Sequence, residues 1–404
     1  MNNYIFPTKN ELYFTGMVIA FILCMAAPSQ AAIDKITSST PITLLSPTIS
    51  VPVKALLDVG IVAFDDGLDL TDEDDTVFPE VRLAESVYFA TQLLRVLEKS
   101  GAWGPVRVIP DRDAIMDLYI EGTILQSDGE TLAMEIVARD SGGLTWFTKK
   151  YRTTVGKYAY DRRRKNAGDP FQNMYISITN ELLQQYERYG VKRALELRQL
   201  SELRFAQRFS PQAFKQYTQT DKEGKIKIVR LPSDADPLLK RVRRIRDRDH
   251  LYIDRMQEFY DGFSRQMHVP YQDFRRASYD SVVKARQLEK QGNQRIIAGI
   301  GTIVAGIYGR LESDTSAGRL ASTTTAGAGG LLVKSGLEKK QRAASYNESV
   351  AEMGSGLETA LAPEIIKLED RTVTLSGNVQ AKYQQWQALL LQIYAEERIP
   401  PENE

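Results

Sequence analysis

Two long stretches without a charged residue constrain this chain more than any other feature. They cover residues 296–309 and 320–333, and a basic residue stands at both ends of each. A helix rises about 1.5 Å per residue, so either stretch would reach only about 21 Å, whereas the hydrocarbon core of a bilayer is about 30 Å thick. Neither stretch is therefore a comfortable membrane-spanning helix alone, and we expect the two to pair.

The first stretch divides by side-chain size when it is wound as a helix. Glycine, alanine and threonine fall on one half of the helical wheel, and isoleucine, valine, leucine and tyrosine fall on the other. Small side chains let two helix backbones approach closely, and such contact can offset the cost of about 1 kcal/mol for each glycine inside a helix. We predict a glycine-rich helical hairpin over residues 292–338. Its predicted packing residues are Gly292, Ala298, Gly299, Thr302, Ala305, Gly306, Gly309, Gly327 and Gly330.

Three interpretations of this hairpin are open: insertion or packing at a membrane, burial in a soluble bundle, and a flexible linker. The segments AGIGTIVAGIYG and AGAGG resemble the glycine-zipper hairpins of bacterial cell-envelope proteins. In that family the hairpins are associated with insertion into the outer or inner membrane and with packing of oligomers. The resemblance therefore implies a membrane-associated protein of the cell envelope, and it favours the first interpretation.

The amino terminus has the pattern of a secretory signal peptide. Residues 17–27, MVIAFILCMAA, form a short apolar run, and Ser29 and Ala31 suit the cleavage positions. We predict a signal peptide over residues 1–31 and a mature chain from about Ala32, with an uncleaved membrane anchor as one alternative. Lipidation of Cys24 is another, although bulky residues precede it where a lipobox needs a small one. Cleavage would leave no cysteine, which suits an oxidising periplasm.

A small α/β domain is predicted over residues 55–155, after a linker or extended arm at 32–54 that is rich in serine, threonine and proline. Its expected elements are a buried strand at 58–64, a helix with apolar residues repeating from Leu83 to Leu97, a strand at 106–109 and a three-strand meander over 117–151. This order of elements is similar to that of small envelope accessory domains, such as the curli secretion lipoprotein and the TolB amino-terminal domain. The likeness implies a role in assembly or secretion and carries over no functional residue.

Residues 170–291 are predicted to form a helical domain, with one helix over 172–208 and another over 272–291. Between them apolar residues repeat with a 4-3 spacing that only Asp249 interrupts. Such a pattern is typical of a long helix paired with another helix, in the chain or in a neighbouring subunit. The residues of this helix seam are Val242, Ile245, Tyr252, Met256, Phe259 and Phe263.

The carboxy-terminal segment, residues 340–399, is predicted to form a helix, a strand pair from Ile365 to Leu375, and a second helix. The apolar face of the first helix, which should end at Pro363, comprises Tyr346, Val350, Met353, Leu357 and Leu361. The face of the second helix comprises Tyr383, Trp386, Leu390 and Ile393. The piece VTLSGNV at 373–379 resembles the strand motif of BON-type envelope domains, and we expect it to form the hairpin tip.

Composition excludes several classes of function. The chain has 52 basic and 52 acidic residues and no net charge, so nucleic-acid binding through bulk charge is not expected. One cysteine and two histidines cannot build a cysteine-type zinc site. The sequence has no nucleophile elbow, P-loop or zinc-protease motif. We therefore expect neither an enzyme nor a bound metal or cofactor.

Charged clusters offer candidate sites of lower specificity. The acidic run at 65–75 lacks the spacing of a calcium-binding EF-hand loop and is interpreted as a solvated loop. A basic run could contact anionic lipid, lipopolysaccharide or peptidoglycan, but interleaved aspartates favour ion pairs within the helix. His250, beside Asp249, has no nucleophile near it in the sequence. The candidate arginines of the basic run are Arg241, Arg243, Arg244, Arg246 and Arg248.

These features predict an α+β chain, in which a small α/β sandwich domain precedes a mostly helical body with a glycine-rich helical hairpin. We expect a non-enzymatic periplasmic protein, serving as an accessory or structural component of a membrane-associated assembly or secretion system, at the outer membrane in preference to the inner. Its expected partners are other envelope proteins and further copies of itself. The alternatives are a secreted carboxylate-dependent hydrolase acting on an envelope polymer, and a soluble periplasmic oligomer joined through the helix seam.

Overall fold

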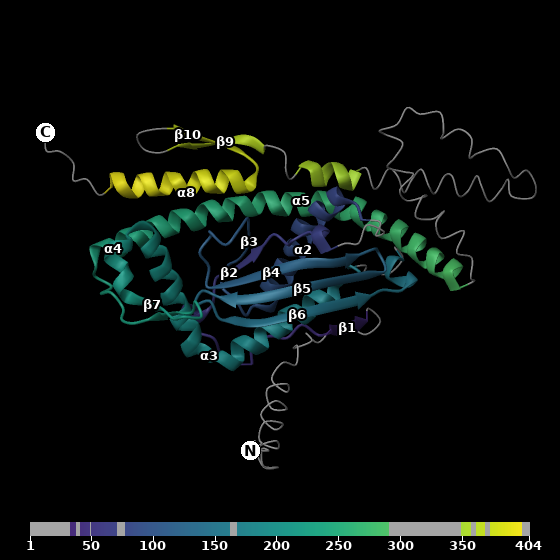
Figure 1. Ribbon diagram of the computed structural model, residues 1–404, viewed down its shortest axis with the longest axis horizontal. Helices are drawn as coiled ribbons and strands as arrows, with labels where there is room; N and C mark the ends of the chain where they lie inside the picture. Colours follow the sequence, from purple (N-terminus) through teal and green to yellow (C-terminus); the bar gives the residue numbers. More distant parts are fainter. Residues whose placement is uncertain are drawn as a thin grey trace, which may run out of the picture.

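The computed structural model describes eight ranges of the chain. They are residues 33–37, 41–48, 50–70, 77–161, 168–290, 349–356, 361–367 and 372–397. The predicted signal peptide and all nine packing residues of the glycine-rich hairpin lie outside these ranges, so both stay predictions. The described residues form an α+β fold, as the sequence predicts (Figure 1).

A six-stranded mixed sheet forms the centre of the fold, with the strand order β1-β6-β5-β4-β2-β3. The neighbours β4, β5 and β6 run antiparallel, whereas β2 is parallel to both β3 and β4. The strands are β1 (Ile33–Thr37), β2 (Val59–Val62), β3 (Val106–Ile109), β4 (Leu118–Ser127), β5 (Thr131–Asp140) and β6 (Thr145–Thr154). The expected strands and meander are thus confirmed, whereas β1, which pairs in parallel with β6, falls in the predicted linker.

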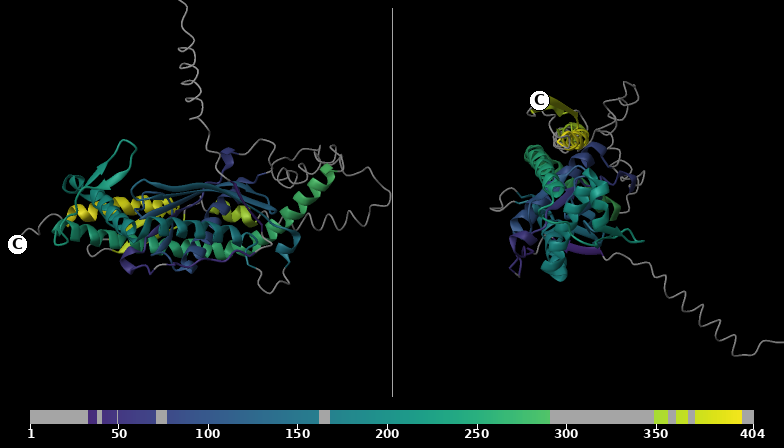
Figure 2. Two further views of the ribbon diagram at one scale, coloured as in Figure 1. Left: turned by 90° about the horizontal axis from the view of Figure 1, so that it is seen from below. Right: turned by 90° about the vertical axis from the view of Figure 1, so that its left-hand side faces the viewer.

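Helix α2 (Pro79–Ser100) makes the crossover between the parallel strands β2 and β3. Proline, which has no backbone N–H, suits the first turn of a helix, because an N–H at that position would have no partner within the helix. The helix ends at Gly101, whose φ of 67° is left-handed and favours glycine. Figure 2 shows the helices gathered on one face of the sheet. Short 3-10 turns complete this part of the chain: η1 (Val53–Ala55), η2 (Leu68–Leu70) and η3 (Lys157–Tyr160).

Helix α3 (Gln172–Phe209) contacts β6 and the arm between β1 and β2. It bends at Gly190, where φ is 75° and the backbone is not helical. The arm at 41–48 runs along α3, where Asn173, Asn180 and Glu187 bond to it at a spacing of seven residues. The region after α3 holds α4 (Pro211–Phe214), η4 (Lys215–Tyr217) and the hairpin of β7 (Thr218–Thr220) and β8 (Ile226–Ile228).

Helix α5 (Pro237–Lys290) is one helix of 54 residues, rather than the two that the sequence predicts. It passes through Pro270, which lacks the backbone N–H of a helical hydrogen bond. Met267 and Tyr271, on either side of that proline, are fully buried. Packing on both sides thus holds the helix together where its sequence favours a break.

At the carboxy-terminal end, one helix lies along α5 and a strand pair packs on that helix, and residues 349–356 are helical (Figure 1). Strand β9 (Leu361–Lys367) pairs with β10 (Thr372–Gly377), and helix α8 (Val379–Glu396) follows. The strand pair and final helix are confirmed. Leu361 and Pro363, expected in and at the end of the first helix, lie in β9 instead. The VTLSGNV piece is not a hairpin tip: it forms β10 and then Asn378, whose side chain caps α8.

The hydrophobic core is continuous from the sheet through the helices. Its buried residues come from β2 to β6 and from α2, α3, α5 and α8. The residues 155–170, where a domain boundary is predicted, lead from β6 into α3, and both of these elements contribute to this one core. Side chains from distant parts of the sequence can therefore meet along α5.

Candidate functional site

Two buried networks of charged and polar side chains hold α5 to the rest of the fold. The Asp117 network lies near the start of α5 and consists of Asp58, Asp117, Arg198, Ser201 and Arg246. The Arg275 network lies near its end and consists of Tyr88, Asp169, Tyr271, Gln272 and Arg275. A cavity adjoins the second network, and the chain leaves α5 for the glycine-rich segment beyond it.

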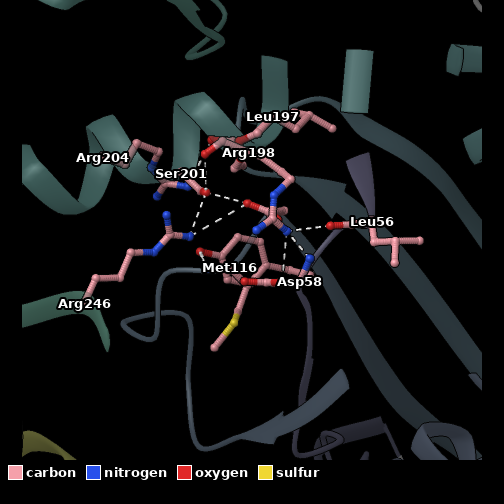
Figure 3. A network of polar contacts seen from close by, with 11 residues as sticks. Leu56, Asp58, Met116, Leu197, Arg198, Ser201, Arg204 and Arg246 are labelled. Atoms are coloured by element: carbon pink, nitrogen blue, oxygen red, sulfur yellow. Dashed lines mark hydrogen bonds and ion pairs between the residues drawn. The ribbon is translucent and has the colours of Figure 1, made fainter. Parts of the chain in front are cut away.

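The Asp117 network begins with two aspartates that stand directly before parallel strands (Figure 3). Asp58 precedes β2 and Asp117 precedes β4, so the pairing of these strands brings the carboxylates together. The backbone N–H of Asp58 donates to Asp117 Oδ2 at 2.8 Å. Arg198 of α3 donates to both carboxylates, at 3.0 Å to Asp58 and 3.3 Å to Asp117.

Ser201 joins α5 to this network. Its hydroxyl donates to Asp117 Oδ1, and Arg246 of α5 donates to the Ser201 oxygen at 2.9 Å. Burial raises the pKa of Asp117, against the opposing effect of Arg246. Ser201 is fully buried, so no substrate could reach its hydroxyl in this conformation. The arrangement fastens α3 and α5 to one edge of the sheet.

His250 lies beside the Asp117 network and carries no charge at neutral pH. Burial, together with Arg246 and Arg107, lowers its pKa to about 3. The carboxylates that neighbour it in sequence face other partners: Asp254 pairs with Arg107 at 2.6 Å, and Asp249 faces α8. The described contacts thus give His250 no carboxylate that would orient it as a general base.

The Arg275 network encloses a fully buried cation. Arg275 Nη1 donates to Asp169 Oδ2 at 2.9 Å, and both side chains are almost completely buried. Aromatic rings surround the guanidinium at 4.2 to 5.8 Å, measured from its carbon to the ring centres. Ring faces attract a desolvated cation. These rings belong to Tyr88, Phe89, Phe171 and Tyr271.

Hydrogen bonds extend the Arg275 network to α2 and to the surface. Tyr88 of α2 has its hydroxyl 2.9 Å from His268 Nδ1 and 3.2 Å from Asp169 Oδ2. Tyr271 donates to the buried Glu85 of α2 at 2.6 Å. Burial raises the pKa of both tyrosines, so both keep their protons at neutral pH. The second half of α5 is thereby tied to α2.

A cavity of about 330 Å³ lies beside this network, between η3 and α5. This volume lies at the lower limit for a small-molecule site. In the described part of the chain, no group of three or more histidine, cysteine, aspartate or glutamate side chains could hold a metal ion. The polar side chains that line the cavity are Tyr160, Asp161, His268, Gln272, Asp273 and Arg276.

The end of α5 is fastened to the turn between β4 and β5. Ser278 donates to the carbonyl of Asp128 at 2.7 Å, and Arg286 pairs with Glu130 at 2.7 Å. Gly129 of this turn has a φ of 81°, and a Cβ there would lie 2.3 Å from the Arg275 carbonyl oxygen. Only glycine permits this close approach. The last described turns of α5 are therefore anchored on the sheet.

The chain is fastened again where it returns from the glycine-rich segment. Val350, in the helical residues 349–356, is fully buried. A Cβ at Gly354 would lie 1.8 Å from the carbonyl oxygen of Glu80, so this segment packs backbone against backbone on the first turn of α2. Both ends of the segment 291–348 are thus attached to the same folded body.

The predicted helix seam is buried inside the chain. Val242 and Ile245 are fully buried, and Tyr252 stacks on Trp386 of α8 with ring centres 4.7 Å apart. Met256 and Phe263 are also buried, and Phe259 packs against the core. Helix α5 contacts α2, α3, α8 and β3. The seam is therefore buried within its own chain, in a helix that packs on several elements and not along a single partner helix.

The candidate arginines of α5 serve mainly as internal contacts. Arg243 pairs with Glu202 of α3 at 2.6 Å, and Arg248 pairs with Glu397 at 2.8 Å. Arg241 lies over the ring of Tyr394 at 4.2 Å and pairs with Glu397, while Arg246 belongs to the Asp117 network. Arg244 is exposed. These partners lie on other elements, whereas the sequence favoured pairs within the helix.

Neither network was predicted from the sequence. One signal for the first was present, because an aspartate is the first residue both of the predicted buried strand at 58–64 and of the predicted meander at 117–151. No comparable signal existed for Arg275, since its neighbour Arg276 is exposed and the two look alike in sequence. The acidic run also behaves as a turn where it is described: Asp65 and Asp66 accept hydrogen bonds from the backbone of Gly67 and Leu68.

No helix in the described ranges is both long enough and apolar enough to cross a membrane. Comparisons with protein-family models, with curated proteins and with solved structures found no match to this chain.

Proposed function

We propose that this chain is a non-enzymatic periplasmic protein of the cell envelope, whose folded body presents the glycine-rich segment to a membrane. The observation that carries the proposal is the attachment of both ends of residues 291–348 to one body. Helix α5 is anchored on the β4–β5 turn before the segment, and residues 349–356 pack on α2 after it. Because both of its ends are attached to one body, the segment can be presented to a membrane as a single hairpin.

The sequence of the displayed segment supplies the second support. It contains both uncharged stretches and the predicted packing glycines, whereas the body carries ordinary surface charge. Small residues allow close packing of helices in a bilayer or between subunits. The protein would then act as an accessory or structural component of an envelope assembly, with the segment as its attachment to the membrane and the body as its contact to partners.

The two alternatives have less support. A carboxylate-dependent hydrolase needs carboxylates that face a cleft, whereas the buried Asp58, Asp117 and Asp169 are engaged by arginines. An oligomer joined through the helix seam would have to displace α8 and other elements of the same chain from α5.

Envelope fractionation with an alkaline carbonate wash tests the proposal. We expect the wild-type protein to stay in one membrane after the wash, and Gly299→Leu and Gly306→Leu to reduce that retention because they enlarge the predicted packing surface. The matched control is Gly262→Leu, since a Cβ at Gly262 on α5 meets no atom within 4 Å. The urea midpoint of each variant checks that the body remains folded. Release of the wild-type protein by the wash, or full retention of both glycine variants, would contradict the proposal.

A further inference from the structure

A carboxylate is buried where α8 docks on α5. Asp249 of α5 is 1% exposed. Its Oδ1 accepts hydrogen bonds from Trp386 Nε1 at 3.2 Å and from Gln387 Nε2 at 3.1 Å, and its Oδ2 accepts one from the Tyr383 hydroxyl at 3.4 Å. All three donors belong to α8, and all three are uncharged. The residue that interrupts the helix seam is therefore the polar centre of this helix contact.

The described ion pairs do not include Asp249, although cations lie close enough to act on it. Arg208 of α3 bonds to Gln387 at 2.7 Å and to Asp113 at 3.3 Å, and Arg246 is held by the Asp117 network. The charge of Asp249 is thus removed from water and compensated mainly by neutral hydrogen bonds. Such burial disfavours the charged form of a carboxyl group.

The rest of the contact between α8 and α5 is apolar, lies near the surface, or involves the buried Arg241, which donates to the Tyr394 carbonyl and lies over its ring. Tyr252 stacks on Trp386, and Leu390 of α8 is fully buried. At the far end of α8, Glu397 pairs with Arg241 and Arg248, where the glutamate and Arg248 side chains are partly exposed. Separation of α8 from α5 would return Asp249 to water.

We propose that α8 is a proton-controlled latch, which holds more tightly to α5 when Asp249 is protonated and loosens when Asp249 is charged. The geometry keeps the hydrogen bonds from Trp386 and Gln387 in the protonated state, and the bond with Tyr383 can reverse its direction. Trp386 and Gln387 still donate to Oδ1, and a proton on Oδ2 can be donated to the Tyr383 oxygen, which also accepts from Gln387. Protonation therefore removes the cost of the buried charge, while the Tyr383 hydroxyl changes from donor to acceptor and its own proton turns away from Oδ2.

The direction of the pH dependence follows from the docked pKa. Burial raises the pKa of Asp249 from an ordinary value of 3.8 to about 6, against the opposing effects of Trp386, Arg208, Tyr383 and Arg246. The docked state therefore binds the proton more tightly than the separated state. The extra stability of docking is complete below about pH 4 and is lost as the pH rises through about 6.

The other groups that face this site do not titrate in the same way. Burial raises the pKa of Tyr383 well above its usual range, with Asp111 and Asp249 adding to the effect, so this tyrosine keeps its proton. His250, with a pKa lowered to about 3, stays neutral above pH 4. Glu397 lies at the other end of α8, beside two arginines. We thus assign to Asp249 the change in the stability of α8 docking between pH 5 and pH 8.

Hydrogen exchange of α8 in the full chain, corrected for the intrinsic effect of pH, tests the latch. We expect the opening equilibrium of α8 to be about tenfold larger at pH 8 than at pH 5, as a pKa of about 6 requires. Asp249→Asn should make this equilibrium independent of pH over that range. The matched control is Asp247→Asn, an exposed aspartate on the same helix, which should keep the wild-type dependence.

A second variant tests the latch even if Asp249→Asn does not fold. Trp386→Phe removes a donor that favours the charged carboxylate, so the midpoint of the pH dependence should move upward. An unchanged midpoint would overturn the proposal, as would a wild-type protein whose α8 opens equally at pH 5 and pH 8. A folded Asp249→Asn variant with the wild-type dependence would overturn it too. The inference is independent of the proposed membrane attachment, because each of these measurements uses the protein in solution.

Discussion

The two networks along α5 bury arginine–aspartate pairs in different surroundings. In the Asp117 network, two carboxylates meet two arginines, and the Arg198 side chain is 35% exposed. In the Arg275 network, one arginine meets one carboxylate, and the two side chains are 1% and 2% exposed. The first network shares its charges among several partners and water, whereas the second concentrates them in one enclosed pair.

The two ends of α5 are therefore held in different ways. Loss of one partner from the Asp117 network leaves hydrogen-bonding groups that can compensate, since Asp58, Ser201 and Arg198 are all linked. Among the described residues, loss of Arg275 would leave the buried Asp169 with the uncharged donors Tyr88, Gln272 and the backbone of Phe171. Substitution in the enclosed pair should therefore lower the free energy of unfolding more than substitution in the Asp117 network. The enclosed pair is also the one nearer the glycine-rich segment.

The largest expected effect comes from Arg275→Met. Removal of one partner from a buried ion pair costs about 3–5 kcal/mol, because the other charge is left uncompensated. We expect the free energy of unfolding, measured with urea, to fall by about that amount. Addition of Asp169→Asn should restore part of the loss, since the uncompensated charge is then gone. The exposed neighbour Arg276 supplies the control, because Arg276→Met should change the free energy of unfolding little. A loss well below 1 kcal/mol for Arg275→Met would show that the pair contributes no more than a surface contact.

A smaller effect is expected from Asp117→Asn. The side chain keeps its shape, and burial already raises the pKa of Asp117, so the variant resembles the protonated residue. We expect a loss of about 1–3 kcal/mol, the range for a buried polar group that loses part of its hydrogen bonding. Asp113→Asn, at an aspartate that is mostly exposed, is the control. If Asp117→Asn lowers the free energy of unfolding more than Arg275→Met does, then sharing charge among several partners does not make the Asp117 network the more tolerant of the two.

Most of the order of strands and helices could be predicted from the sequence, because those elements have local causes, whereas β1, β7 and β8 were not predicted. Alternating apolar residues indicate the meander, and Pro79 and Gly101 stand at the ends of α2. The continuity of α5 could not be predicted, since burial of Met267 and Tyr271 by distant elements outweighs the local effect of Pro270.

The candidate sites were harder to predict for the same physical reason. Asp249 is visible in the sequence as an interruption of the seam, but the donors that make it a docking point lie on α8, more than a hundred residues later. Arg275 is chosen over Arg276 by its position on the helix relative to Tyr88 and Phe171, which belong to other segments. Sequence patterns give the face of a helix, whereas the identity of what meets that face comes from the tertiary fold.

The smallest expected effect comes from Arg286→Gln, at the ion pair between the end of α5 and Glu130. The Glu130 side chain is only 8% exposed, but half of the Arg286 side chain is exposed. Solvent therefore reaches the guanidinium and screens the pair, so we place its contribution near the roughly 0–1 kcal/mol of exposed pairs. We expect the free energy of unfolding, measured with urea, to fall by an amount within that range, and by less when the salt concentration is raised. Glu130→Gln should give the same result, because it removes the same pair. If either variant cost as much as Arg275→Met, the end of α5 would be held by surface charge, and the aromatic enclosure of Arg275 could no longer explain how the glycine-rich segment is anchored.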